Sequence, residues 1–167
     1  MTGRLGILKI MNIMKSILLL VLIFTSVIIG NQPPCNKENV PIKTENNGTM
    51  ANEKIKITVN SQIFTATLLD NNTSKVFKEL LPMTIPMTEL NGNEKYYDLP
   101  KSLPTNSTNP GSIKNGDLML YGSNTLVLFY KTFQTSYNYT KLGCIDNTAG
   151  LQKAIGAGNV SVTIYKN

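Results

Sequence analysis

The sequence predicts a mainly β protein, a closed antiparallel β-barrel of about eight strands with two short helices, over residues 53–167. Short segments in which apolar and polar residues alternate recur between turn-forming residues, which is typical of antiparallel strands. Only two stretches, residues 72–81 and 146–158, combine helical spacing with a capping residue. A sheet with this many strands avoids exposed edges by closing on itself.

The predicted domain opens with a hairpin and a helix. Residues 54–59 and 63–69 alternate apolar and polar side chains, and Asn60-Ser61 between them favours a turn. Asn72 or Thr73 can cap the helix that follows, and Pro82 ends it. One face of this helix collects its apolar residues, which are Val76, Phe77, Leu80 and Leu81.

A second hairpin is predicted around Asn91-Gly92, because both residues tolerate positive φ. Residues 83–90 form its first strand, and Pro86 places that strand at an edge or a bulge. The return strand carries Tyr96 and Tyr97. Residues 100–116 hold three prolines among Asn, Ser, Thr and Gly, which predicts a long surface loop of a kind that is often functional.

Residues 116–130, GDLMLYGSNTLVLFY, are two apolar runs around a polar break. The second run is apolar at residues 126–130 without interruption, as expected for a strand buried on both faces. Residues 135–145 predict another strand, with Tyr137 and Tyr139 on one face.

The second helix is predicted within residues 146–158. Asp146 or Asn147 can cap it, and Gly156 or Gly158 can end it. The last strand is indicated by alternating apolar residues at Val160, Val162 and Ile164.

The first 52 residues differ in composition from the rest. Residues 17–29 are a run of thirteen residues that are all apolar except Thr25 and Ser26. Lys15 precedes this run, and a basic residue before an apolar run is typical of a signal peptide. A membrane span needs about 20 residues, but an uncleaved N-terminal anchor stays an alternative for residues 1–30. Residues 31–52, rich in Asn, Pro, Lys, Glu and Thr, predict a disordered tether.

These features predict a secreted, periplasmic or cell-envelope protein of a bacterium. Translation can also begin at Met11 or Met14. A lipid anchor at Cys35 is not expected, because residues 32–34 are Gln-Pro-Pro and not the small residues of a lipobox. Cys35 lies in the predicted tether, so we expect it and Cys144, the other cysteine, to be free thiols.

Composition excludes several kinds of chemistry. The chain has 16 basic and 10 acidic residues, and loss of residues 1–30 leaves 13 lysines against the 10 acids. These lysines are scattered, so no nucleic-acid surface is predicted. Arg4 is the only arginine, and histidine and tryptophan are absent. Residues 53–167 therefore lack the groups for Ser-His-Asp or Cys-His catalysis, a histidine-ligated metal or an arginine clamp.

Three strings carry a resemblance to a known family: TELNGNEKYYDLP at residues 88–100, GDLMLYGSNTLVLFY at residues 116–130 and YTKLGCID at residues 139–146. They resemble the cyclophilin-like proteins, small bacterial domains with the barrel of the cyclophilin peptidyl-prolyl isomerases but a divergent sequence. The resemblance spans about residues 53–165 and implies a closed cyclophilin-like barrel.

The resemblance also implies where an active site would lie. Cyclophilins rotate X-Pro bonds, against a barrier of about 18–20 kcal/mol, in a groove on the outer face of the barrel. Their central arginine stands in a Phe-His-Arg-Val strand, but the matching residues 86–90 read Pro-Met-Thr-Glu-Leu. A lysine lacks the planar fork of a guanidinium and is a poor substitute. We therefore expect no isomerase activity of the cyclophilin type.

If a groove persists, tyrosines and methionines on its faces could grip an extended peptide or a small aromatic ligand. The alternative is plain packing, because alternate residues of a strand point into the core. Glu89, with Glu94 and Asp98 nearby, lacks a partner base for acid–base catalysis. The candidate groove residues are Met87, Glu89, Tyr96, Tyr97, Met119, Tyr121 and Phe129.

The sequence thus predicts an exported, non-catalytic module of the cell envelope that binds a peptide or a small ligand. The alternatives are a prolyl isomerase with a rebuilt active site, and a partner domain for a redox or membrane protein. No cofactor, metal or nucleic acid is expected, and membrane contact is expected only through the N-terminal segment.

Overall fold

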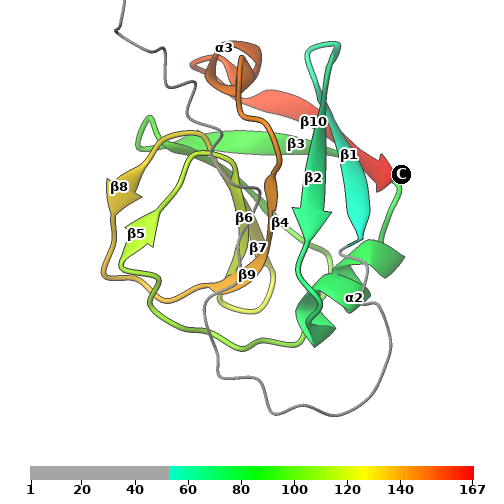
Figure 1. Cartoon of the computed structure of the whole chain (residues 1–167), viewed down its shortest axis with the longest axis vertical. Helices are drawn as coiled ribbons and strands as arrows, with labels where there is room; N and C mark the ends of the chain where they lie inside the picture. Colours follow the sequence, from blue (N-terminus) through cyan, green and yellow to red (C-terminus); the bar gives the residue numbers. More distant parts are fainter. Residues whose placement is uncertain (1–52) are drawn as a thin grey trace, which may run out of the picture. The chain divides into compact units, whose positions relative to one another are not determined.

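The structure, a computed structural model, describes residues 53–167, which form a closed eight-stranded barrel, a small two-stranded sheet and two helices (Figure 1). The predicted signal segment and tether lie outside the described residues. The strands are β1 (Lys54–Val59), β2 (Gln62–Leu68), β3 (Met83–Leu90), β4 (Glu94–Asp98), β5 (Ser112–Ile113), β6 (Asp117–Tyr121), β7 (Thr125–Phe129), β8 (Phe133–Gln134), β9 (Thr140–Ile145) and β10 (Val160–Lys166). The helices are α2 (Asn72–Glu79) and α3 (Leu151–Ile155). Neither of these two helices of the described part is long and apolar enough to cross a membrane.

Strand β1 closes the barrel. Around the barrel the strands follow the order β1-β10-β3-β4-β7-β6-β9-β2, and neighbouring strands are antiparallel. Ile57 of β1 lies opposite Ile164 of β10 on one side and Phe64 of β2 on the other. This confirms the predicted mainly β, closed antiparallel barrel.

Alternation along the strands separates the barrel interior from its outer face. On β1, Ile55, Ile57 and Val59 are fully buried and belong to the interior core. Strand β7 is buried on both faces, as its uninterrupted apolar run predicts. Its even-numbered residues Leu126 and Leu128 join the interior core, and Val127 and Phe129 join a second apolar cluster on the outer face.

The predicted hairpins are confirmed, and one helix cap is one residue off. Asn60 and Ser61 have φ of 45° and 66°, which matches their place in the β1–β2 turn. Helix α2 is capped by Asn71 and not by Asn72 or Thr73, because the extended Asn71 accepts a hydrogen bond from the Ser74 amide at 2.8 Å.

The second helix starts later than predicted. Its N-cap is Gly150 and its C-cap is Gly156, so only the predicted end is confirmed. Asp146, a predicted cap, lies four residues before Gly150 and binds elsewhere. Its carboxylate accepts a hydrogen bond from Lys54 Nζ at 2.7 Å, which joins the loop before α3 to β1.

The small sheet β5–β8 was not predicted. Ser112, which lies within the expected loop of residues 100–116, is paired with Gln134 of β8. The strand predicted from residue 135 begins only at Thr140, so Tyr137 and Tyr139 precede β9. Tyr139 is nevertheless held, because its backbone exchanges two hydrogen bonds with Thr108, at 2.9 and 3.0 Å.

The segment before β5 lies bound along the barrel. The Leu103 amide donates to Ser123 O at 2.7 Å, and the Leu103 side chain is buried. Thr73 Oγ1 of α2 donates to Pro104 O at 2.7 Å, and the Asn106 amide donates to Thr140 Oγ1 at 3.0 Å. The predicted surface loop is therefore largely exposed, and three hydrogen bonds tie it to other elements as a strap.

Cys144 on β9 is disulfide-bonded. The expectation of two free thiols is therefore wrong. Cys35 lies outside the described residues.

Gly143 is the point at which β9 touches β2 most tightly. A Cβ at this position would lie 2.2 Å from Thr67 O and 3.0 Å from Leu68 Cα, both backbone atoms of β2. We expect Gly143→Ala to destabilise the protein by about 1–3 kcal/mol, because neither strand can retreat inside a closed barrel. Urea unfolding followed by circular dichroism measures this.

The matched control is Gly158→Ala, where a new Cβ meets nothing within 4 Å. Its unfolding free energy should stay within about 0.5 kcal/mol of the parent. Equal stability of both variants would contradict the close approach at Gly143.

Candidate functional site

The structure distributes the seven predicted groove residues over both faces of the barrel wall. Met87 is 1% exposed and lies in the interior core, and Tyr97 packs against that core. Met119 and Phe129 lie in the outer cluster, and Tyr96 packs against it. Tyr121, on β6, is 46% exposed. Glu89 faces the interior end of the barrel, as its contacts below show.

The outer cluster is an aromatic layer over β4, β7 and β6. Phe129 contacts Tyr139 edge to face, with ring centroids 5.5 Å apart, and Phe133 of β8 at 5.7 Å. Such aromatic pairs contribute more stability than the apolar area that they bury would provide alone. The remaining buried members of this layer are Ile113, Met119 and Val127.

Three tyrosines continue this layer to the solvent, and we call them the tyrosine surface: Tyr121, Tyr137 and Tyr139. Tyr139 is buried and its ring centroid lies 5.6 Å from that of Tyr121. Tyr121 meets Tyr137 at 6.1 Å with ring planes at 90°. Tyr137 is 62% exposed. The surface thus presents two exposed rings on a buried aromatic base.

Burial raises the pKa of Tyr139, and the charge of Glu94 raises it further. Tyr139 therefore stays a neutral phenol that can donate a hydrogen bond. The exposed rings of this surface can stack on a ligand, but the surface offers no nucleophile or base.

A polar cluster lies on the interior side of the wall. Lys95 of β4 is fully buried, and its Nζ donates to Glu89 Oε2 and to two loop carbonyls, Gly156 O at 3.1 Å and Gly158 O at 2.5 Å. Tyr130 Oη lies 2.9 Å from each carboxylate oxygen of Glu89. We call Glu89, Lys95 and Tyr130 the interior ion pair cluster.

The backbone completes this cluster. The Gly92 amide donates to Glu89 Oε1 at 2.8 Å, and Asn159 Oδ1 accepts from the Glu89 amide at 2.9 Å. Lys95 Nζ also lies 5.2 Å from the centroid of the Tyr130 ring. The cluster therefore joins the β3–β4 hairpin to the loop between α3 and β10, which Figure 1 shows at the same end of the barrel.

Electrostatics keeps Glu89 ionised. Burial would raise its pKa, but the hydrogen bonds from Lys95, Tyr130 and the Gly92 amide outweigh burial and lower the pKa below 4.5. Burial and the bonded carboxylate raise the pKa of Tyr130 to about 12. Burial, and then the charge of Glu89, raises the pKa of Glu94. A paired carboxylate and a neutral phenol with fixed partners have a structural role.

The sequence prediction did not pair Lys95 with Glu89, because Asn91-Gly92 predicts a two-residue turn between β3 and β4. Leu90 lies opposite Glu94, so the hairpin loop has three residues, Asn91, Gly92 and Asn93. A two-residue turn would have placed Glu94 opposite Glu89, whereas the extra residue brings Lys95 there. Counting outward from the three-residue loop would have identified the pair.

Metal binding has no support in the described part of the chain. Within residues 53–167, no three His, Cys, Asp or Glu side chains gather in a way that could hold a metal ion. The acidic residues near the hairpin bind protein groups instead, since Asp98 accepts a hydrogen bond from Thr125 Oγ1 at 2.7 Å.

Comparison with known proteins identifies the barrel. Residues 57–165 match the family model described as the cyclophilin-like family. A hypothetical protein from Archaeoglobus fulgidus, known from a solution structure, is similar, with 17% identity over 70% of this chain and 95% of the other and a TM-score of 0.49. No curated protein matches the chain.

The interior ion pair cluster predicts that removing the ammonium group of Lys95 strongly lowers the free energy of unfolding. Lys95→Met should destabilise the protein by about 3 kcal/mol, because Glu89 then keeps its charge with a side chain only 20% exposed. Urea unfolding measures this. The double variant Lys95→Met with Glu89→Gln should lose less than the sum of the two single losses.

Lys75→Met is the matched control, since the Lys75–Asp70 pair (2.8 Å) is largely exposed. That variant should lose much less stability than Lys95→Met, because solvent screens an exposed ion pair. Additive losses at Lys95 and Glu89 would show that the two side chains do not interact in solution.

Lowering the pH should reduce the free energy of unfolding, because Glu89 becomes protonated. Because the pKa of Glu89 is lower in the folded protein than its usual 4.5, its contribution is present above pH 4.5 and is lost as the pH falls through the folded value. Unfolding free energies from pH 6 down to pH 3 should therefore fall less steeply for Glu89→Gln than for the parent. Parallel curves for the two proteins would exclude this linkage.

Proposed function

Because the chain belongs to the cyclophilin-like family, whose barrel carries ligand contacts on its outer wall in the cyclophilins, we propose that residues 53–167 form a non-catalytic binding module. Its ligand is an extended, proline-containing peptide, held on the tyrosine surface. The module acts outside the cytoplasm or at the cell envelope, a location that the signal-like residues 17–29 support.

The observation that carries this proposal is the exposure of two rings on a rigid base. Tyr121 and Tyr137 are 46% and 62% exposed, and their planes stand at 90°. Prolines in a polyproline II helix dock against such aromatic surfaces, because their rings are apolar and the helix is already ordered. The tyrosine hydroxyls can bond the peptide carbonyls, which this helix leaves unpaired.

The positions of the cations support the proposal that the module is not catalytic. Residues 53–167 contain no arginine. Lys95 is turned into the barrel and cannot reach a peptide on the outer face. Lys141 of β9 is paired with Asp117 at 2.9 Å. A twisting X-Pro amide would thus find no fixed guanidinium on this wall, and a paired lysine is a poor replacement.

Peptide binding is tested with a blocked hexaproline peptide and a blocked Gly-Ser hexapeptide of the same length. Calorimetry should show binding of the first only, and Tyr137→Ala should weaken it by about tenfold, or about 1.4 kcal/mol. Ile63→Ala is the control, because Ile63 is 60% exposed on β2 and belongs to neither aromatic group. No binding of hexaproline, or equal loss in both variants, would refute the proposed surface.

The same proteins distinguish binding from isomerisation. In a protease-coupled assay on an X-Pro peptide, the parent should leave the rate at its uncatalysed value. Acceleration that Glu89→Ala or Tyr97→Ala abolishes would instead establish the alternative, a prolyl isomerase with a rebuilt site.

A further inference from the structure

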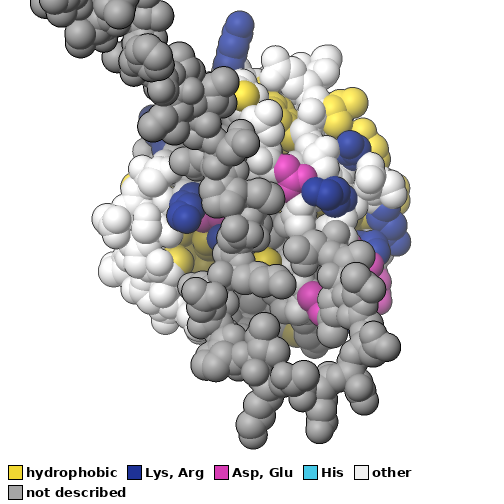
Figure 2. All heavy atoms as spheres, in the orientation of Figure 1, with side chains coloured by type: hydrophobic (Ala, Val, Ile, Leu, Met, Phe, Trp, Pro, Cys, Tyr) yellow, Lys and Arg dark blue, Asp and Glu magenta, His cyan; other side chains and the backbone are white. Residues whose placement is uncertain are grey.

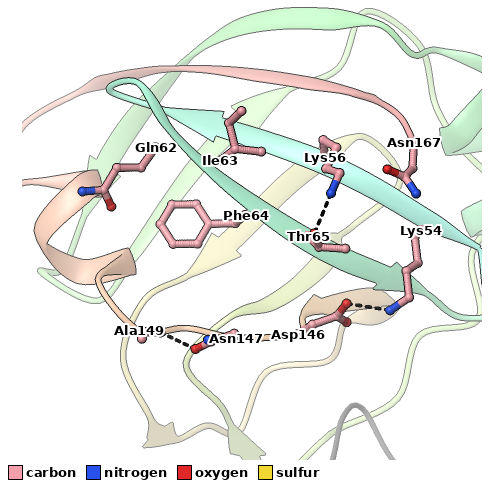
Figure 3. Close-up of a pocket in the computed structure, with 10 residues that line it drawn as sticks. All are labelled: Lys54, Lys56, Gln62, Ile63, Phe64, Thr65, Asp146, Asn147, Ala149 and Asn167. Atoms are coloured by element: carbon pink, nitrogen blue, oxygen red, sulfur yellow. Dashed lines mark hydrogen bonds and ion pairs between the residues drawn. The ribbon is translucent and has the colours of Figure 1, made fainter.

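A second site lies on the outer wall at β1 and β2, formed by strands that do not contribute to the tyrosine surface. A shallow cavity of about 740 Å³ lies between these strands and the loop before α3 (Figure 3). This volume is in the range of small-molecule sites. Figure 2 shows lysine side chains gathered on the β1–β2 side of the visible face.

The two lysines that line the cavity differ in their partners. Lys54 Nζ is neutralised by Asp146 Oδ2 at 2.7 Å and also donates to Thr67 Oγ1 at 3.1 Å. Lys56 Nζ, in contrast, has one partner within residues 53–167, the neutral hydroxyl oxygen of Thr65 at 2.9 Å. Lys56 thus contributes an uncompensated positive charge with donor capacity to spare.

The neighbouring side chains add donors and one apolar contact. Asn147 uses its Oδ1 to accept from the Ala149 amide at 2.9 Å, which leaves its NH₂ group toward the cavity without a bond inside the described chain. The side chain of Gln62 makes no hydrogen bond within that same part. Ile63, 60% exposed, stands at the rim.

We propose that this cavity binds a small organic carboxylate that carries an aliphatic group. The carboxylate accepts hydrogen bonds from Lys56 Nζ and from the Asn147 amide, because charge-assisted bonds of this kind are strong. The aliphatic group covers Ile63 and removes it from water. The inference does not depend on the peptide function proposed above, since the two sites share no residue.

The test uses the full chain labelled with ¹⁵N and two probes of equal shape. N-acetyl-leucine carries a carboxylate, whereas N-acetyl-leucinamide replaces it with a neutral amide. The acid should shift the amide signals of Lys56, Thr65 and Asn147 saturably, and the amide probe should bind at least tenfold more weakly. Lys56→Gln should also weaken binding of the acid about tenfold, whereas Lys101→Gln, an equal loss of charge at an exposed residue outside the cavity, should not.

Three results would overturn the proposal: equal binding of the two probes, equal loss in Lys56→Gln and Lys101→Gln, or shifts at Tyr121 and Tyr137 instead. Inorganic phosphate is the third probe. Binding of phosphate as tight as that of N-acetyl-leucine would exclude a contribution from Ile63, and thus the aliphatic specificity. The unperturbed signals of each spectrum show that the variants are folded.

Discussion

The arrangement of every side chain in this domain depends on the pairing of β1 with two partners, β10 and β2, which closes the sheet. In a closed barrel each residue of a strand must point either into a finite interior or outward, and a shift of one residue reverses the whole strand. Neighbours such as Lys95 and Tyr96 consequently have opposite surroundings: the first is sealed among carbonyl and carboxylate oxygens, and the second packs against the outer aromatic layer. The family resemblance supplies the barrel, but this alternation decides which side chains can meet a ligand.

The interior ion pair cluster shows why the only buried lysine of the described residues is structural. Taking an ammonium group out of water is costly unless its protons are all bonded, and Glu89 with two glycine carbonyls supplies three acceptors. The cluster links a hairpin tip to the loop after α3 and turns the charge of Lys95 into the barrel, away from the outer wall. The outer wall carries the exposed rings of Tyr121 and Tyr137.

Local sequence patterns predicted most of the fold. Alternation predicted the hairpins, turn residues marked their tips, and the run at residues 126–130 predicted a strand buried on both faces. The predictions that failed concern features that depend on contacts between residues far apart in the sequence. Strands β5 and β8 are two residues each and exist because they pair, so no local period reveals them. Asp146 does not cap α3 as predicted, and its carboxylate binds Lys54, 92 residues away in the sequence. The groove set mixed both faces because it included Tyr96 and Tyr97, neighbours on one strand whose side chains point to opposite faces. The exposed Tyr137 was not among the predicted groove residues, because it was assigned to a strand that in the structure begins only at Thr140.

The strap formed by the segment before β5 matters for anyone who wishes to alter this protein. Its composition suggests a linker into which an epitope tag or a reporter could be spliced. Yet Leu103, Pro104 and Asn106 are each hydrogen-bonded to a different element: to Ser123 between β6 and β7, to Thr73 of α2 and to Thr140 of β9. An insertion there would disrupt all three attachments and expose Leu103, whose buried side chain belongs to the interior core.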